Sequence, residues 1–110
     1  MSAPASGLAL ARRDDIADPG ALIADAGGVS LILTRRGAHV RAFLNRCTHA
    51  DYPLQRPDGR VLVQEGRYLV CGAHGASYTL DDGACAGGPC NGRGLTLVAI
   101  IERDGVIYTA

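Results

Sequence analysis

Two short segments of the chain each offer one thiol and one imidazole. Metals in proteins bind deprotonated sulfur and neutral ring nitrogen, and two loops that each supply one of each can meet around a single site. The pattern therefore predicts one metal site with four protein ligands. These ligands are Cys47 and His49 in the first segment and Cys71 and His74 in the second, with residues 50–70 between the segments.

The order Cys-x-His followed by Cys-x-x-His resembles the Rieske family. In that family a [2Fe-2S] cluster is held asymmetrically, because two His replace two Cys on one of the irons. The resemblance implies that Cys47 and Cys71 bind the inner iron, and that His49 and His74 bind the outer iron, nearer to solvent. The cofactor expected from the resemblance is a [2Fe-2S] cluster.

Residues around the four ligands match the same family pattern. Gly75 directly follows the second His, Tyr78 lies four residues after it, and the stretch Gly87-Gly88-Pro89 matches the loop that covers the cluster. The resemblance also implies an exposed edge where electrons are exchanged. Framing that edge we expect Ala50, Asp51, Tyr52, Gly75 and Pro89, with Asp51 and Arg56 as candidate docking residues.

Two other interpretations of the same residues stay open from the sequence. In one, Cys47 and Cys71 are small buried hydrophobic residues and the two His are ordinary surface residues. In the other, the four side chains form a mononuclear zinc site. Zinc fingers usually pair Cys with Cys and His with His, so a mixed pair in each segment favours the cluster.

Cys85 and Cys90 are left over from the ligand pattern. Four Cys in a short chain can form two disulfides with three possible connectivities. Two disulfides are disfavoured if the chain stays in the cytosol, where thiols are kept reduced. We expect Cys85 and Cys90 to pack beneath the third loop, and a local disulfide between them stays open.

Length and charge exclude several classes of protein. A chain of 110 residues is expected to form one domain with a single core. The 11 cationic residues are all Arg, they balance 11 acidic residues, and they are scattered without a basic block. A nucleic-acid partner is therefore not expected.

No apolar run of the sequence approaches the about 20 residues needed to cross a bilayer. We therefore expect no membrane association. The Arg12-Arg13 pair is followed by two acidic residues rather than by an apolar segment, and residues 1–7 lack the features of a secretory signal. The expected compartment is the cytoplasm.

Short apolar stretches separated by Gly and Asp turns run through the chain, and no long segment has helical periodicity. This pattern is typical of an all-β sandwich or open barrel of antiparallel strands. A turn that includes at most one helical turn is expected between residues 14 and 20. The expected strands cover residues 7–12, 21–25, 30–34, 39–44, 61–63, 67–70, 76–80, 95–102 and 106–109.

The Rieske resemblance implies how these strands are divided. Within a single domain of residues 1–110, residues 1–46 and 91–110 are expected to form a base, and residues 47–90 an inserted cluster-binding subdomain. The strands before Cys47 and Cys71 each run directly into a ligand, so two hairpins are expected to position the site.

A [2Fe-2S] cluster moves one electron, and the chain shows no second site for mononuclear iron, flavin or substrate. We therefore expect an electron-transfer protein and not an enzyme. It resembles a small Rieske-type ferredoxin that takes electrons from a flavin-dependent reductase and passes them to a terminal oxygenase. An alternative is a noncatalytic Rieske-like small subunit of a larger oxidoreductase such as nitrite reductase.

The same resemblance implies a low reduction potential. High-potential members carry a disulfide between the two ligand loops and a Ser hydroxyl that bonds a cluster sulfur, and here those positions hold Tyr52, Ala73 and Ala76. Fewer hydrogen-bond donors stabilise the reduced cluster less. The expected potential is at the low end of the family's span, roughly −150 mV.

Overall fold

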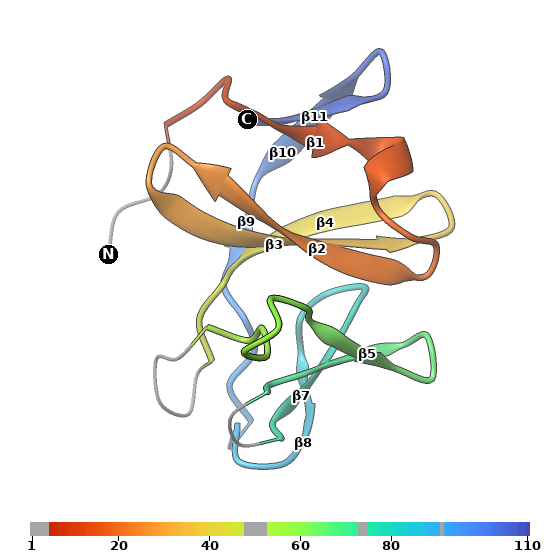
Figure 1. Ribbon diagram of the computed structural model, residues 1–110, viewed down its shortest axis with the longest axis vertical. Helices are drawn as coiled ribbons and strands as arrows, with labels where there is room; N and C mark the ends of the chain where they lie inside the picture. The colour runs from red at the N-terminus through yellow and green to blue at the C-terminus, as the bar shows by residue number, and fades with distance from the viewer. Residues whose placement is uncertain (1–4, 48–52, 73–74, 91) are drawn as a thin grey trace.

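The computed structural model describes residues 5–47, 53–72, 75–90 and 92–110, and these form a nearly all-β fold (Figure 1). The helical element in the described part is a single 3-10 turn, η1 (Arg13–Asp15). The strands are β1 (Ala9–Arg12), β2 (Gly20–Ala26), β3 (Val29–Arg36), β4 (His39–Leu44), β5 (Leu62–Gln64), β6 (Tyr68–Val70), β7 (Ser77–Thr79), β8 (Cys85–Gly87), β9 (Leu97–Val98), β10 (Ile100–Arg103) and β11 (Val106–Thr109).

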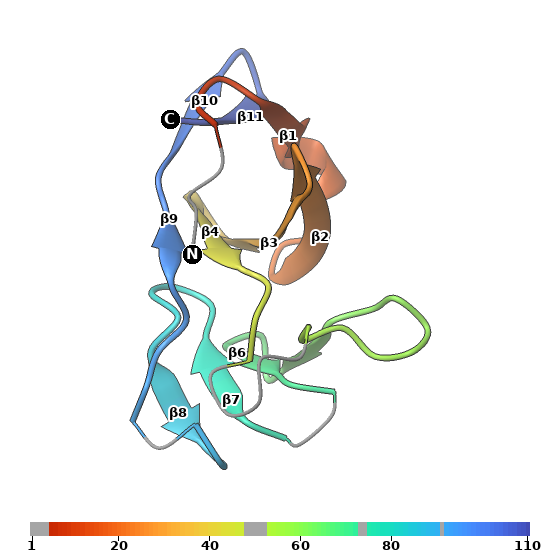
Figure 2. The same ribbon diagram turned by 90° about the vertical axis from the view of Figure 1, so that its left-hand side faces the viewer.

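Three antiparallel sheets are built from these strands. Sheet A has the order β1-β11-β10, sheet B the order β2-β3-β4-β9, and sheet C the order β5-β6-β7-β8. Sheets A and B surround a common interior at one end of the molecule, and sheet C lies at the other end (Figures 1 and 2). The predicted all-β fold of antiparallel strands is confirmed.

Strand β3 is the central element of the fold. Its residues alternate between the two faces of sheet B, as any strand does. Leu33 packs with the apolar residues between sheets A and B, whereas Ile32 packs with the residues of sheet C. Both side chains are fully buried. A strand that is covered on both faces explains the continuous apolar run in this part of the sequence.

Sheet B and sheet C are joined by side chains as well as by the chain itself. The hydroxyl of Thr34 donates a hydrogen bond of 2.8 Å to the carbonyl oxygen of Leu80, just after β7. Phe43 of β4 packs on the turn at Gly83, where a Cβ would lie 2.6 Å from its ring. Gly83 also has a φ of +72°, so both the backbone conformation and the space beside Phe43 require glycine at this position.

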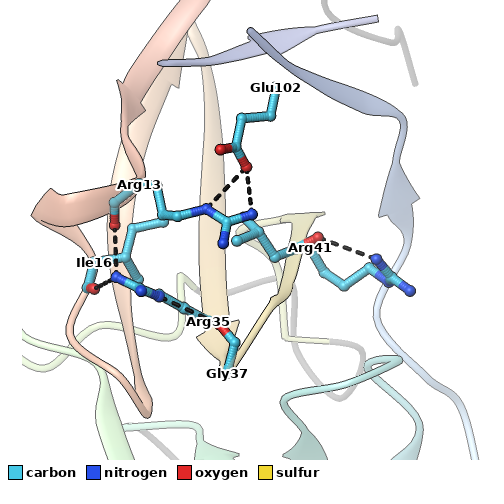
Figure 3. Close-up of polar contacts among 7 residues, drawn as sticks. Arg13, Ile16, Arg35, Gly37, Arg41 and Glu102 are labelled. Atoms are coloured by element: carbon cyan, nitrogen blue, oxygen red, sulfur yellow. Dashed lines mark hydrogen bonds and ion pairs between the residues drawn. The ribbon is translucent and has the colours of Figure 1, made fainter. Parts of the chain in front are cut away.

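Arginine side chains stabilise the end of the molecule that is formed by sheets A and B (Figure 3). The Nη1 of Arg35, on β3, donates to the carbonyl oxygens of Arg13 (3.2 Å) and Ile16 (3.3 Å), which lie at the two ends of η1. Arg13 also pairs with Glu102 of β10 at 2.6 Å. These contacts tie the 3-10 turn to sheets A and B, where Ile16 is buried.

Two predicted elements differ from the structure. The third loop contains the short strand β8, which pairs with β7 through Tyr78↔Cys85 and Ser77↔Gly87. The strand expected over residues 95–102 divides at Ala99, because β9 pairs with β4 in sheet B and β10 pairs with β11 in sheet A. The chain thus passes from sheet B to sheet A within a few residues. The apolar sequence of this segment does not indicate that change.

None of the described residues forms a helix that is long and apolar enough to cross a membrane.

Candidate metal centre

Cys47 and Cys71 lie in one buried cluster. Their residues are 0% and 2% exposed, and both belong to the apolar group that also holds Ile32, Phe43 and Tyr78. Neither Cys is in a disulfide. The structure thus brings together the two predicted thiol ligands, which are 24 positions apart in the sequence.

Tyr78 brings a hydroxyl group to this cluster. Its side chain is fully buried, and its oxygen lies 3.5 Å from the Sγ of Cys47, within hydrogen-bond distance for sulfur. The register Leu69↔Tyr78 places it beside β6, the strand that leads to Cys71. Strand β7 therefore places the Tyr78 hydroxyl beside the sulfur of Cys47.

The segment that follows Cys71 turns back on itself. The N–H of Cys71 donates to the carbonyl oxygen of Ala76 at 2.8 Å, and the N–H of Gly75 donates to the carbonyl oxygen of Cys71 at 3.0 Å. Gly75 has a φ of +76°, which favours glycine. Two backbone hydrogen bonds therefore fix the ends of the second ligand loop.

Asn45 connects the two thiol segments, and the sequence analysis did not identify it. Its side-chain amide donates to Ser30 Oγ (3.0 Å) and Gln55 Oε1 (2.6 Å), and its oxygen accepts from the N–H of Leu54 at 2.8 Å. The carbonyl oxygen of Leu54 in turn accepts from the N–H of Gly72. The sequence signal for such a connecting residue is a polar side chain between an apolar strand and a predicted ligand.

A disulfide joins Cys85 and Cys90, whose Cα atoms are 6.0 Å apart. The sequence left open whether this pair only packs beneath the third loop or also forms a local disulfide, and the structure contains the disulfide. Cys90 is 1% exposed and Cys85 is half-buried. The four Cys of the chain are thus divided into one disulfide and one pair of buried thiols.

The loop closed by this disulfide packs on the second ligand segment. At Gly88, where φ is +74°, an added Cβ would lie 2.7 Å from the carbonyl oxygen of Gly75 and 3.0 Å from the Cα of Ala76. This is a close backbone approach that excludes any other residue. The third loop therefore lies against the chain just beyond the second predicted His.

Several predicted site residues lie outside the described residues. They are the two imidazole ligands His49 and His74 and the flanking residues Ala50, Asp51, Tyr52 and Ala73. Of the other predicted residues, Arg56 is exposed and packs over Gly72, where a Cβ would lie 3.2 Å from the Cα of Arg56.

The turn that connects β7 to β8 is held by Asp82. The carboxylate accepts hydrogen bonds from the hydroxyl of Thr79 and from the N–H of Ala84, the latter at 3.0 Å. The Thr79 hydroxyl is the main cause that lowers the pKa of Asp82 below its usual value, and the Ala84 N–H adds to it. Asp82 therefore stays ionised to lower pH in the folded protein than in the unfolded chain.

The described residues fit a [2Fe-2S] cluster on the thiol side. A cluster of this kind needs thiolate ligands that are shielded from water and hydrogen-bond donors directed at sulfur. Cys47 and Cys71 are buried in one apolar group, and the Tyr78 hydroxyl lies 3.5 Å from the sulfur of Cys47. The donor set is thus suited to iron.

Comparisons with known proteins support the same assignment. A search of curated protein sequences gives no significant match. Among solved structures, the chain is similar to the ferredoxin of carbazole 1,9a-dioxygenase from Nocardioides aromaticivorans IC177, with 21% identity and a TM-score of 0.75 over 99% of this chain and 98% of that one. Similarity to the terminal oxygenase of carbazole 1,9a-dioxygenase from Novosphingobium sp. KA1 covers 92% of this chain and 28% of that one, with 19% identity and a TM-score of 0.75.

At these identities the similarity establishes the fold. The sequence itself matches the Rieske [2Fe-2S] domain over residues 7–102, which is most of the chain. That domain implies a [2Fe-2S] cluster as the cofactor. The match, the fold and the paired buried thiols agree, and the chain belongs to the Rieske [2Fe-2S] domain family.

Proposed function

We propose that the protein is a one-electron carrier of the Rieske ferredoxin type. In this proposal Cys47 and Cys71 hold one iron of the cluster, and His49 and His74 hold the other. The observation that carries the proposal is the pair of buried thiols beside the Tyr78 hydroxyl, in a chain whose sequence matches the Rieske domain. We further propose that the chain is an electron-transfer component and not an enzyme.

When bound, a [2Fe-2S] cluster accepts and releases a single electron. The residues of the chain control the surroundings of that electron. The apolar side chains around Cys47 and Cys71 exclude water, and the Tyr78 hydroxyl, 3.5 Å from the Cys47 sulfur, would donate to that sulfur when it is a thiolate ligand. A hydrogen bond to sulfur stabilises the more negative, reduced form and so raises the reduction potential.

We propose a flavin-dependent reductase as the electron donor and a terminal oxygenase as the acceptor. The full-length similarity to a dioxygenase ferredoxin supports this pair of partners. Several solved structures with the same fold are complexes of an oxygenase with a ferredoxin of carbazole 1,9a-dioxygenase. The similar structures do not favour the alternative of a nitrite reductase small subunit.

The chain divides, in our proposal, into a base of residues 1–46 and 91–110 and a cluster-binding subdomain of residues 47–90. In support, all four strands of sheet C fall within residues 62–87, and the strands of sheets A and B fall outside the inserted segment. A cytoplasmic location stays a prediction from the sequence.

Electron transfer tests the proposal directly. The purified holoprotein is reduced by NADH and a flavin-dependent ferredoxin reductase, and then mixed without oxygen with an oxidised Rieske-type terminal oxygenase in a stopped-flow instrument. We expect the visible absorbance to show transfer of one electron from each chain to the oxygenase.

Cys71→Ser is the matched control, because it removes a proposed ligand and should give no transfer. A holoprotein that accepts no electron from the reductase, or keeps it in the presence of the oxygenase, contradicts the carrier role. A colourless protein with bound zinc contradicts the cluster itself.

A further inference from the structure

The Cys85–Cys90 disulfide closes a very short loop. The two residues are five positions apart, so the cross-link removes less conformational freedom from the unfolded chain than one between distant residues. Its contribution to folding stability is accordingly at the low end for a disulfide. Stabilisation of the folded state therefore does not account well for the presence of this disulfide.

The two residues of the disulfide differ in their access to solvent. Cys90 is 1% exposed and its Sγ lies within 3.7 Å of two backbone carbonyl oxygens, whereas Cys85 is half-buried on β8, an edge strand of sheet C. A thiolate attacks a disulfide along the S–S axis and needs access to the sulfur that it attacks. Access thus selects Cys85 as the attacked sulfur and Cys90 as the leaving group.

The surroundings of Cys90 also suit the reduced form. Its Sγ lies 3.2 Å from the carbonyl oxygen of Gly87 and 3.7 Å from that of Ser77. In the disulfide these are contacts without a hydrogen, because the sulfur carries no proton. After reduction the Cys90 thiol can donate to Gly87, so reduction does not leave a buried polar group without a partner.

We propose that Cys85–Cys90 is a redox-active disulfide that exchanges with a dithiol reductant at the Sγ of Cys85. A thiolate of the dithiol attacks this sulfur, the S–S bond breaks, and Cys90 leaves as a thiolate that takes up a proton. The second thiolate of the reductant then attacks the reductant's other sulfur, which is bound to Cys85 in the mixed disulfide. Cys85 leaves as a thiolate and also takes up a proton. The pair gains two electrons and two protons, and the dithiol becomes a disulfide.

Reduction has a structural consequence for the second ligand loop. The disulfide closes residues 85–90 into a loop whose Gly88 packs directly on Gly75 and Ala76. Without the cross-link, the contact between the third loop and this segment depends more on the short β7–β8 ladder. The reduced protein is therefore expected to exchange the amide hydrogens of residues 75–76 faster, while those of β3 stay protected.

Thiol trapping in the native holoprotein tests the exchange. The protein is incubated without denaturant with dithiothreitol, alkylated with iodoacetamide, and digested for peptide mass spectrometry. We expect Cys85 to become alkylated in the native protein, because its sulfur is the one that exchanges. A Cys85 that is alkylated only after denaturation would show that the disulfide is a permanent structural cross-link and would overturn the proposal.

Two single variants test which sulfur reacts. In Cys90→Ser the remaining Cys85 is exposed to oxidised glutathione, and in Cys85→Ser the remaining Cys90 is exposed to it. We expect Cys85 to form the mixed disulfide at least about tenfold faster than Cys90, because of its access to solvent. Equal rates, or faster reaction of Cys90, would contradict the assignment. These readouts do not depend on electron transfer by the cluster.

Discussion

In sheet B, β2 and β3 are seven and eight residues long and pair along the whole length of β2, whereas each strand of sheet C has three residues. The base is held by backbone ladders and by aliphatic side chains packed between two sheets. Sheet C has short ladders, and its core contains Cys47, Cys71, Tyr78 and Cys90. Its stability therefore depends more on the cluster that we propose it holds.

The contrast shows how this fold separates folding from function. Long strands form a base that needs no cofactor to exclude water from its core. The short strands and loops at the other end bring together groups from distant parts of the chain, and they gain rigidity from the disulfide, from Asn45 and, in our proposal, from the cluster. Substitutions in the base should therefore have measurably different effects from substitutions in sheet C.

Cavities in the two cores should have different consequences. Leu33→Ala in the base and Leu69→Ala in sheet C each remove a fully buried side chain, at a cost of about 2–5 kcal/mol. We expect Leu33→Ala to lower the Tm of the whole protein, and Leu69→Ala to shorten the lifetime of the cluster as well. Tm is measured by circular dichroism and cluster loss by visible absorbance. Equal cluster lifetimes in the two variants would contradict the contrast.

Removal of the Asn45 side chain should loosen the connection between the two ends. Asn45→Ala leaves the N–H of Leu54 and the amide oxygen of Gln55 without their partner, at a cost of about 1–3 kcal/mol. We expect faster hydrogen exchange around residues 53–56 and a shorter cluster lifetime. Ser30→Ala is the control, because it removes one bond at the base side of Asn45 and should cost less. An Asn45→Ala protein with unchanged exchange would show that this brace contributes little.

Ala76→Ser tests the expected tuning of the potential. Ala76 is fully buried in the same apolar group as Cys71, and its carbonyl oxygen accepts from the N–H of Cys71. If the added hydroxyl bonds a cluster sulfur and favours the reduced state by about 1 kcal/mol, the potential rises by about 40 mV. Ser77→Ala, one residue on, is the matched control. An unchanged or lower potential in an intact Ala76→Ser cluster would show that position 76 does not face the sulfur.

Asp82→Asn should have the smallest effect, and one that depends on pH. The pKa of Asp82 is lowered in the folded protein from 3.8, chiefly by the Thr79 hydroxyl, so the ionised carboxylate favours folding above the unfolded-state pKa. That contribution is lost as pH falls through the folded-state pKa. We expect a small decrease in Tm at pH 7 that becomes smaller as the pH falls below the unfolded-state pKa. A decrease of the same size at neutral and at acidic pH would contradict the electrostatic origin.

Periodicity and turn residues predicted the fold well because the strands of the base alternate clearly and end at Gly. The range of β4 agrees with the prediction, and the expected η1 turn is present. Strand β8 was missed because its Gly-rich sequence has low strand propensity, and tertiary pairing with β7 decides its structure. The division at Ala99 depends on a change of partner strands, which local sequence does not encode.

The ligand set of the candidate site stays a prediction from the spacing of Cys and His. The structure places Cys47 and Cys71 in one buried apolar group, and His49 and His74 lie outside the described residues. The contact of Gly88 with Gly75 could not be predicted, because it joins segments that are separate in the sequence. The spacing of Cys85 and Cys90 permitted a disulfide without requiring one.

Electron paramagnetic resonance of the dithionite-reduced holoprotein, combined with nitrogen hyperfine spectroscopy, tests the central claim most directly. We predict the spectrum of a reduced [2Fe-2S] cluster with coupling to two histidine nitrogens, of which one is lost in His49→Cys, and no cluster signal in Cys71→Ser. A reduced protein without nitrogen coupling, or a Cys71→Ser protein with normal iron and sulfide content, would contradict the account.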